Sequence, residues 1–235
     1  MGLTGLLLCG FLKVHFAGNL LLFVGADAYN QYAHTLHSQE WLIKIAEGGL
    51  VILFMAHLYL AYATTSDNRA ARKKEYEEKE SKQESGTLIY ALKPHNWMFF
   101  TGSVVLLFLI LHLADFALEL RPDFDYEGLQ PYDKALMILR NPISFTVYCV
   151  GTIALCWHLL HGVASAFQSL GINHPKYNKP IKILGTIFAV VFGLGFIMFP
   201  LWANGVKDKK PKTEQSQSSE AQKHQKIIKK TSSEH

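Results

Sequence analysis

The sequence of 235 residues predicts an all-α integral membrane protein in which five transmembrane helices form a bundle. Five long stretches are apolar and almost free of charge, and each is long enough to cross a hydrocarbon layer of about 30 Å as a helix. Strongly polar segments separate these stretches. Charged residues make up 18% of the chain, below the ~25% of ordinary soluble domains, so the composition agrees with the pattern.

The second predicted span has aromatic residues near both of its ends. Trp41 and either Tyr59 or Tyr62 suit the two membrane–water interfaces, where amphipathic rings gather. The five spans are predicted to cover residues 1–24, 41–64, 95–120, 143–170 and 181–202.

The segments between the spans are expected to be polar links at residues 27–40 and 121–134. Residues 172–180 contain Pro175 and Pro180 and are predicted to form a turn, because proline cannot continue the interior of a helix. Three glycines of the fifth span are expected to let another helix approach closely: Gly185, Gly193 and Gly195.

The chain is predicted to form a transmembrane domain over residues 1–204, with a polar cytoplasmic loop at about 65–94. Residues 205–235 are rich in Lys, Ser, Gln and Glu, so they cannot bury enough apolar area to fold and are expected to form a disordered tail. Cys9, Cys149 and Cys156 form no CxxC motif and are expected to be small buried apolar residues.

The distribution of Lys and Arg predicts the orientation, because basic residues mark the cytoplasmic side. Basic residues crowd the link between the second and third spans and recur between the fourth and fifth. The N-terminus is therefore predicted to be cytoplasmic and the tail to lie on the far side of the cytoplasmic (inner) membrane. The net charge of +4 comes from loops and tail, so we expect membrane lipid as a neighbour and no nucleic acid.

Four of the five spans carry histidines: His15, His57, His112, and His158 with His161. In the predicted orientation, His15 and His112 fall in the outer half of the membrane, while His57 and His158 fall in the inner half. Two opposed imidazoles from different helices at one depth are what a six-coordinate b-type haem requires. The sequence thus predicts two haems between helices one to four, with His15, His57, His112 and either His158 or His161 as axial ligands of the iron.

The histidines have two other interpretations. A single histidine in a span is more often a core residue bonded to a neighbouring helix, but one per span at two depths favours haem. A different metal site would need acidic or thiolate partners at one depth, and Glu47 and Asp115 lie toward the ends of their spans. Spacing alone does not choose between His158 and His161, which are i and i+3.

Several motifs of the chain resemble a known family. The pattern HxxHGxxSAFQSLGxNHPKY follows RNPIS, and FLKVHFAGNL and GADAYNQYAHTLHS precede it. Together they resemble the di-haem cytochrome b (b558-type) membrane-anchor subunit of succinate dehydrogenase and fumarate reductase, over about residues 6–201. The resemblance implies one axial ligand from each of the first four helices. It selects His158 and implies that His161 contacts a haem propionate or the inner quinone region.

The resemblance also implies the partners and the reaction. A flavoprotein subunit and an iron–sulfur subunit would belong to the same complex, and this chain would pass electrons through two b haems to a quinone, menaquinone or ubiquinone. The chain has no G-x-G-x-x-G and no cysteine cluster, so it would not act on succinate by itself. Some fumarate-reducing members place a glutamate where Cys156 stands, and a thiol cannot replace that carboxylate as a proton relay.

Quinone contacts are expected on the outer side, where Lys13, His34 and His37 are candidates. Each of them has an ordinary alternative as an exposed loop histidine or a lysine that extends to the interface. Two other functions were considered: the di-haem anchor of a hydrogenase or formate dehydrogenase, and a non-redox transporter. The motif of the fourth helix argues against the first. A transporter predicts carboxylates in the middle of spans and interrupted helices, and neither is evident.

Overall fold

The computed structural model describes residues 1–71 and 97–205, and it does not describe the side chains of residues 68–71. Every regular element in these ranges is a helix. The predicted loop at about 65–94 lies mostly outside the described residues, except that residues 65–71 continue a helix. The predicted tail lies outside them after residue 205. The helices form one compact unit from Met1 to Ala203.

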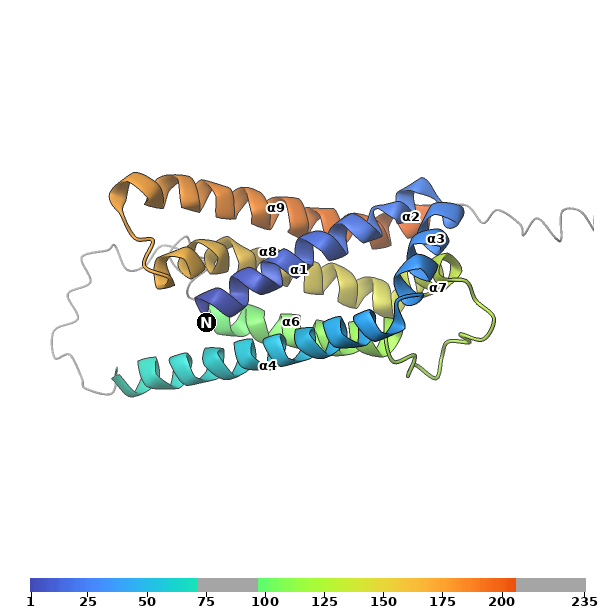
Figure 1. Cartoon of the computed structure of the whole chain (residues 1–235), viewed down its shortest axis with the longest axis horizontal. Coiled ribbons are helices and arrows are strands. Elements are labelled where there is room, and N and C mark those ends of the chain that lie inside the picture. The colour runs from blue at the N-terminus through green and yellow to red at the C-terminus, as the bar shows by residue number, and fades with distance from the viewer. Residues whose placement is uncertain (72–96, 206–235) are drawn as a thin grey trace, which may run out of the picture. The chain divides into compact units, whose positions relative to one another are not determined.

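Five long apolar helices, each able to cross a membrane, confirm the predicted number of spans among the described residues. Successive spans run in opposite directions, so the N-terminus and the end of the last helix lie at opposite ends of the bundle (Figure 1). The spans are α1 (Gly2–Asn19) with α2 (Leu21–Val24), α4 (Glu40–Ala71), α6 (Met98–Phe116), α8 (Pro142–Ser169) and α9 (Pro175–Gly205).

Two further helices close the end of the bundle opposite the N-terminus (Figure 1). Helix α3 (Ala26–His37) occupies most of the link predicted at residues 27–40, and α7 (Pro131–Arg140) begins within the link predicted at 121–134 and continues beyond it. Gly25, with φ of 131°, turns the chain between α2 and α3. The two helices are joined where the side-chain oxygen of Asn30 accepts a hydrogen bond from the backbone of Tyr132 at 2.8 Å.

Residues at both ends of helix α7 favour its start and its end, although its sequence is mixed in polarity. Pro131 occupies its first turn, where the missing N–H costs nothing, and Arg140 in the last turn suits the negative end of the helix dipole. Its apolar face is buried through Ala135, Leu136, Ile138 and Leu139. Asn141 then caps α8 by accepting hydrogen bonds from two backbone amides, and Pro142 begins that helix.

The predicted turn at residues 172–180 is wrong in part, because α9 already begins at Pro175 and contains Pro180 and Pro200. Pro175 is the first helical residue, which needs no N–H. Pro180 lies in the second turn, so the one bond it removes is close to the end of the helix, where water can replace it. The bend that separates α8 from α9 is at Gly171, with φ of 87°.

The glycines of α9 have the role that the sequence predicted. A Cβ atom at Gly193 would lie 2.3 Å from the Cβ of Cys156 on α8, and one at Gly195 would lie 2.6 Å from the ring of Phe16 on α1. Gly185 is in van der Waals range of α8 as well. These positions confirm that small residues let α9 approach its neighbours.

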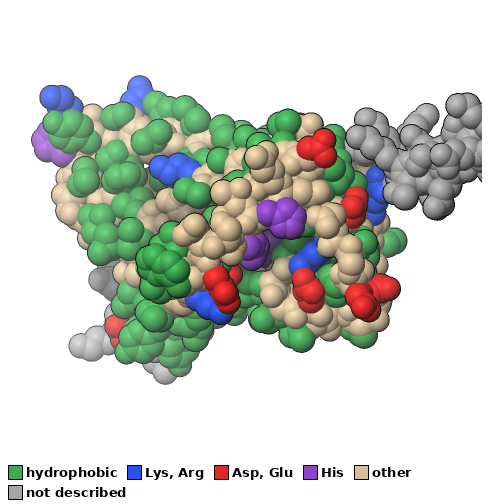
Figure 2. Space-filling model, turned by 45° about the vertical axis from the view of Figure 1, so that its right-hand side comes forward, with side chains coloured by type: hydrophobic (Ala, Val, Ile, Leu, Met, Phe, Trp, Pro, Cys, Tyr) green, Lys and Arg blue, Asp and Glu red, His purple; other side chains and the backbone are tan. Residues whose placement is uncertain are grey.

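Most of the buried apolar side chains gather toward the end closed by α3 and α7, including Leu22, Ile138, Tyr148 and Phe199. A second, smaller cluster of Leu159, Val163 and Ala189 joins α8 to α9. Figure 2 shows hydrophobic side chains over much of the visible flank, with acidic side chains mainly toward the α3 and α7 end. An apolar flank with polar ends suits a helix bundle that faces lipid.

Candidate functional site

His15 on α1 and His112 on α6 lie together. Their ring centroids are 5.7 Å apart, and the rings are nearly perpendicular, at 81°. Aromatic side chains surround both: Phe11 and Phe196 stack on His15, while Phe108 and Phe116 lie against His112. This pair, predicted for the outer half of the membrane, is therefore enclosed by apolar rings.

His57 on α4 and His158 on α8 form the second pair. They are close enough to interact electrostatically. Each imidazole is held by a threonine of another helix: Thr4 Oγ1 lies 3.1 Å from His57 Nδ1, and Thr101 Oγ1 lies 3.4 Å from His158 Nδ1.

The two pairs occupy different levels of the bundle. Gly5 of α1 lies against His57, and Gly102 of α6 lies against His158. Gly5 precedes His15 by ten residues, as Gly102 precedes His112. Ten residues of helix rise about 15 Å, so both α1 and α6 put the same distance between the two levels.

Tyr148 supports His112. Its phenol donates a hydrogen bond to Asp115 Oδ2 at 3.1 Å, and the phenolic oxygen lies 3.3 Å from His112 Nδ1. Because the hydroxyl proton is directed to the carboxylate, the oxygen acts as acceptor toward the imidazole N–H. A histidine protonated on Nδ1 keeps the lone pair of Nε2 for a metal, which is the arrangement usual for metal-bound histidines.

His15 differs from the other three. Its Nε2 lies 3.4 Å from the amide nitrogen of Asn19, which also donates to the carbonyl of His15 at 2.8 Å. Because the contact with Nε2 is long, the side chain of Asn19 is held mainly by its hydrogen bond to the carbonyl oxygen of His15.

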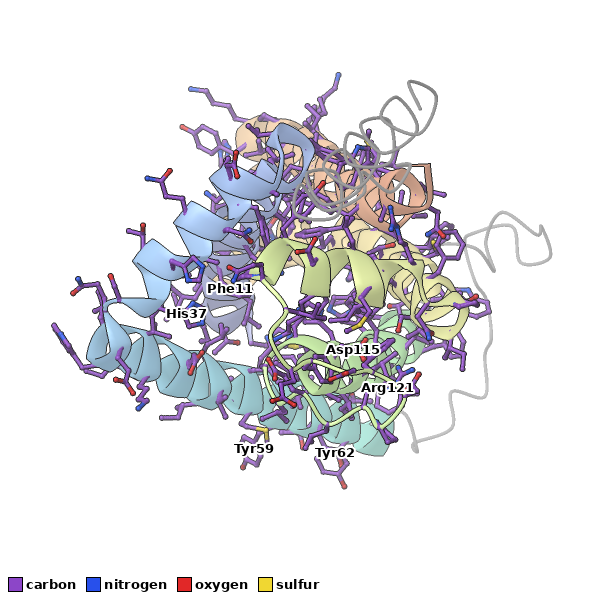
Figure 3. All side chains as sticks on the ribbon, turned by 90° about the vertical axis from the view of Figure 1, so that its right-hand side faces the viewer. Phe11, His37, Tyr59, Tyr62, Asp115 and Arg121 are labelled. Atoms are coloured by element: carbon purple, nitrogen blue, oxygen red, sulfur yellow. The ribbon has the colours of Figure 1, made fainter. Side chains whose placement is uncertain are left out.

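Asp115 is the most buried charged group of the site, with 0% of its surface exposed. Its carboxylate accepts from Tyr148 and lies 3.3 Å from Arg121, with Ser144 at 3.5 Å. Figure 3 shows Asp115 and Arg121 next to each other at the end of the bundle that carries α7. A buried carboxylate needs such partners, and here they join α6, the loop after it and α8.

Arg121 has a second carboxylate partner in the loop after α6, Asp123, at 2.5 Å. The hydrogen bond from Arg121 lowers the pKa of Asp123, and the same bond raises the pKa of Arg121. Arg121 also lies over the ring of Phe124, 4.8 Å from its centroid. The guanidinium therefore stays charged and fixed between the buried carboxylate and the surface.

The other predicted site residues are scattered. His161 is half-buried, one turn beyond His158, and interacts with it electrostatically. Lys13 is exposed on α1. His34 and His37 are exposed on α3, where His34 Nε2 lies 3.1 Å from the side-chain oxygen of Gln130 and His37 bonds the carbonyl of Ala33. The structure does not bring these four residues into one cluster.

The arrangement fits axial ligation better than a polynuclear or acidic metal site. Within residues 1–71 and 97–205, no three His, Cys, Asp or Glu side chains converge as metal ligands. The 5.7 Å between the centroids of His15 and His112 is an ordinary distance for an edge-to-face ring contact, and it is also close to the roughly 6 Å that one metal bound to both rings would give. Three of the four histidines also have Nδ1 beside a hydroxyl oxygen.

Sequence reasoning did not identify the residues that hold the histidines. Thr4, Thr101 and Tyr148 are common residue types in apolar helices, and only tertiary packing brings them to the imidazoles. Asp115 was noticed as a carboxylate near a span end, but its distance of three residues from His112 was the only signal of its role. No family model, curated protein or solved structure matches the chain.

Proposed function

We propose that this chain is the membrane-anchor and electron-transfer subunit of a succinate:quinone oxidoreductase that binds two b haems. The observation that carries the proposal is the arrangement of four histidines from four spans as two pairs, at levels about 15 Å apart along the helices. The motif at residues 158–177 supports the choice of this oxidoreductase over other di-haem anchors.

In this proposal His57 and His158 hold the inner haem, while His15 and His112 hold the outer one. Haem iron, when bound, supplies one-electron chemistry by alternating between its ferric and ferrous states. The chain's own contribution is to present Nε2 atoms from two sides, to fix the imidazoles through Thr4, Thr101 and Tyr148, and to exclude water with apolar rings.

The proposed partners are a flavoprotein that holds the dicarboxylate and an iron–sulfur protein docked on the cytoplasmic face. Lys176, Lys179 and Lys182 are exposed at the start of α9, at the same end of the bundle as the N-terminus, and suit an acidic partner (Figure 1). Electrons would enter at the inner pair, pass to the outer pair and leave to a quinone near the α3 end, where His34 is the candidate contact.

The test is a pyridine haemochrome assay with a reduced-minus-oxidised spectrum of the purified protein. We expect about two b haems per chain with low-spin bands. Replacing His15, His57, His112 or His158 singly with alanine removes one axial ligand and should cost one haem. His37→Ala is the matched control, because His37 is exposed and bonds only its own helix, and this variant should keep both haems.

A folded and membrane-inserted protein without haem would contradict the proposal and favour a transporter. A wild-type protein that binds one haem instead of two would mean that one of the two histidine pairs is assigned wrongly. His161, one turn from His158, would then be the first residue to substitute.

A further inference from the structure

A Thr-Gly dipeptide occurs at the inner level on each of two helices. Thr4-Gly5 lies on α1 against His57, and Thr101-Gly102 lies on α6 against His158. In both cases the threonine hydroxyl is near Nδ1 of the imidazole. In both cases a Cβ on the glycine would lie against Cε1 of the same ring, at 3.5 Å for Gly5 and 3.4 Å for Gly102.

The hydroxyl proton of each threonine is already used within its own helix. Thr4 donates to the carbonyl of Met1 at 2.9 Å. Thr101 donates to the carbonyl of Trp97 at 3.0 Å, with the carbonyl of Met98 at 3.2 Å as an alternative. A hydroxyl has one proton, so a threonine that donates to its own helix accepts from the histidine.

This constraint decides the tautomer of both imidazoles. If the threonine oxygen accepts, Nδ1 must carry the proton, and the neutral ring then has its lone pair on Nε2. The same hydrogen bond fixes the rotation of the ring. The glycine beside each threonine faces the same ring, at a distance where a Cβ atom would make ordinary van der Waals contact.

On the basis of the function proposed above, we propose that Thr4 and Thr101 are positioning residues for one haem, the inner one. Each accepts a hydrogen bond from the Nδ1–H of one imidazole: Thr4 on α1 accepts from His57, and Thr101 on α6 accepts from His158. The hydrogen bonds fix the orientation of the two rings, so that each Nε2 lone pair is available to the iron. They also make both imidazoles more basic, which stabilises ferric iron. The contact of Thr4 is the shorter one, so Thr4 should matter more.

The test uses Thr4→Val and Thr101→Val in the complete protein, since valine keeps the shape and removes the acceptor. Redox titration followed optically should resolve two haems. We expect the midpoint potential of one haem to rise in either variant, the same haem in both, with the larger rise for Thr4→Val. The affinity for that haem should fall about 10- to 100-fold. The low-spin ferric EPR signal of that haem should shift.

The controls separate positioning from general structure. Thr4→Ser and Thr101→Ser keep the acceptor oxygen and should retain the wild-type potentials and EPR signals. Thr186→Val removes a hydroxyl that bonds only its own helix, to Lys182, and should change neither haem.

Unchanged potentials, spectra and affinity in both valine variants would overturn the inference, as would equal effects on the two haems. Serine variants that behave like the valine variants would overturn it too. These failures differ from failure of the proposed function, which would appear as a wild-type protein that binds no haem.

Discussion

At the scale of single residues, the hydroxyls near His57 and His158 donate to backbone carbonyls, whereas the hydroxyl near His112 donates to a carboxylate. The phenol of Tyr148 donates to Asp115, which is fully buried and paired with Arg121. Such a chain is more polarised than a threonine bonded to a backbone carbonyl. The two levels of the bundle therefore offer chemically different surroundings to their histidines.

Tyr148→Phe should destabilise the protein by about 1–3 kcal/mol, because it leaves Nδ1–H of His112 without its acceptor and removes a donor from Asp115. Chemical unfolding in detergent micelles measures this loss. Tyr59→Phe is the matched control. Tyr59 points outward from α4 and is 70% exposed, so its loss of a hydroxyl should change stability by less than about 0.5 kcal/mol (Figure 3). Equal stability of the two variants would refute the structural role of the network.

Asp115→Ala should cost more than Tyr148→Phe, because it leaves Tyr148 and Ser144 without their carboxylate acceptor and removes one of the two carboxylate partners of Arg121. The same unfolding measurement compares the two. If the aspartate network is one unit, adding Tyr148→Phe to Asp115→Ala should cost less than the sum of the single losses. Strict additivity would mean that the two groups act independently.

At the scale of elements, α9 packs through glycine, and the outcome of a substitution there depends on the neighbour. Gly193 faces the Cβ and Cα of Cys156, which are part of a rigid helix and cannot move aside cheaply. Gly10 of α1 is also helical but has nothing within 4 Å of where a Cβ would lie. Alanine at these two positions therefore separates steric conflict from helix propensity.

Gly193→Ala should lower stability by about 1–3 kcal/mol through overpacking, although alanine favours the helix. Gly10→Ala should leave stability unchanged or raise it by up to about 1 kcal/mol. Thermal unfolding of both variants in the same detergent gives the comparison. A stabilised Gly193→Ala variant would show that α8 and α9 do not approach each other as closely as described.

Elements also differ in how far the sequence revealed them. The five spans follow from long apolar runs, since only a helix satisfies its own backbone in lipid. Helices α3 and α7 are harder to predict, because their residues are mixed in polarity and they lie within or beside polar links. Their capping and dipole residues, such as Pro131 and Arg140, were present, but burial of Ile138 and Leu139 against other helices is what makes α7 a helix.

At the scale of the whole molecule, an odd number of spans puts the two ends of the described helices at opposite ends of the bundle (Figure 1). The orientation in the membrane is a prediction from the basic loops. Alkaline phosphatase, active only outside the cytoplasm, should be active when fused after residue 205 and inactive when fused within residues 72–96. The reverse pattern would invert the assignment of inner and outer histidine pairs.

The sequence by itself determined the number of spans and their approximate ends, because the length and apolarity of a stretch are local properties of the chain. It also identified the histidines within the spans, because a polar residue inside an apolar stretch is visible without the fold. It also predicted the close approach of α9, since glycine has no side chain to prevent it. Tertiary structure alone decided which groups hold the imidazoles. Thr4 is 53 residues from His57, and Tyr148 is 36 from His112. No local pattern encodes such contacts, because they depend on how helices distant in the chain rotate and pack.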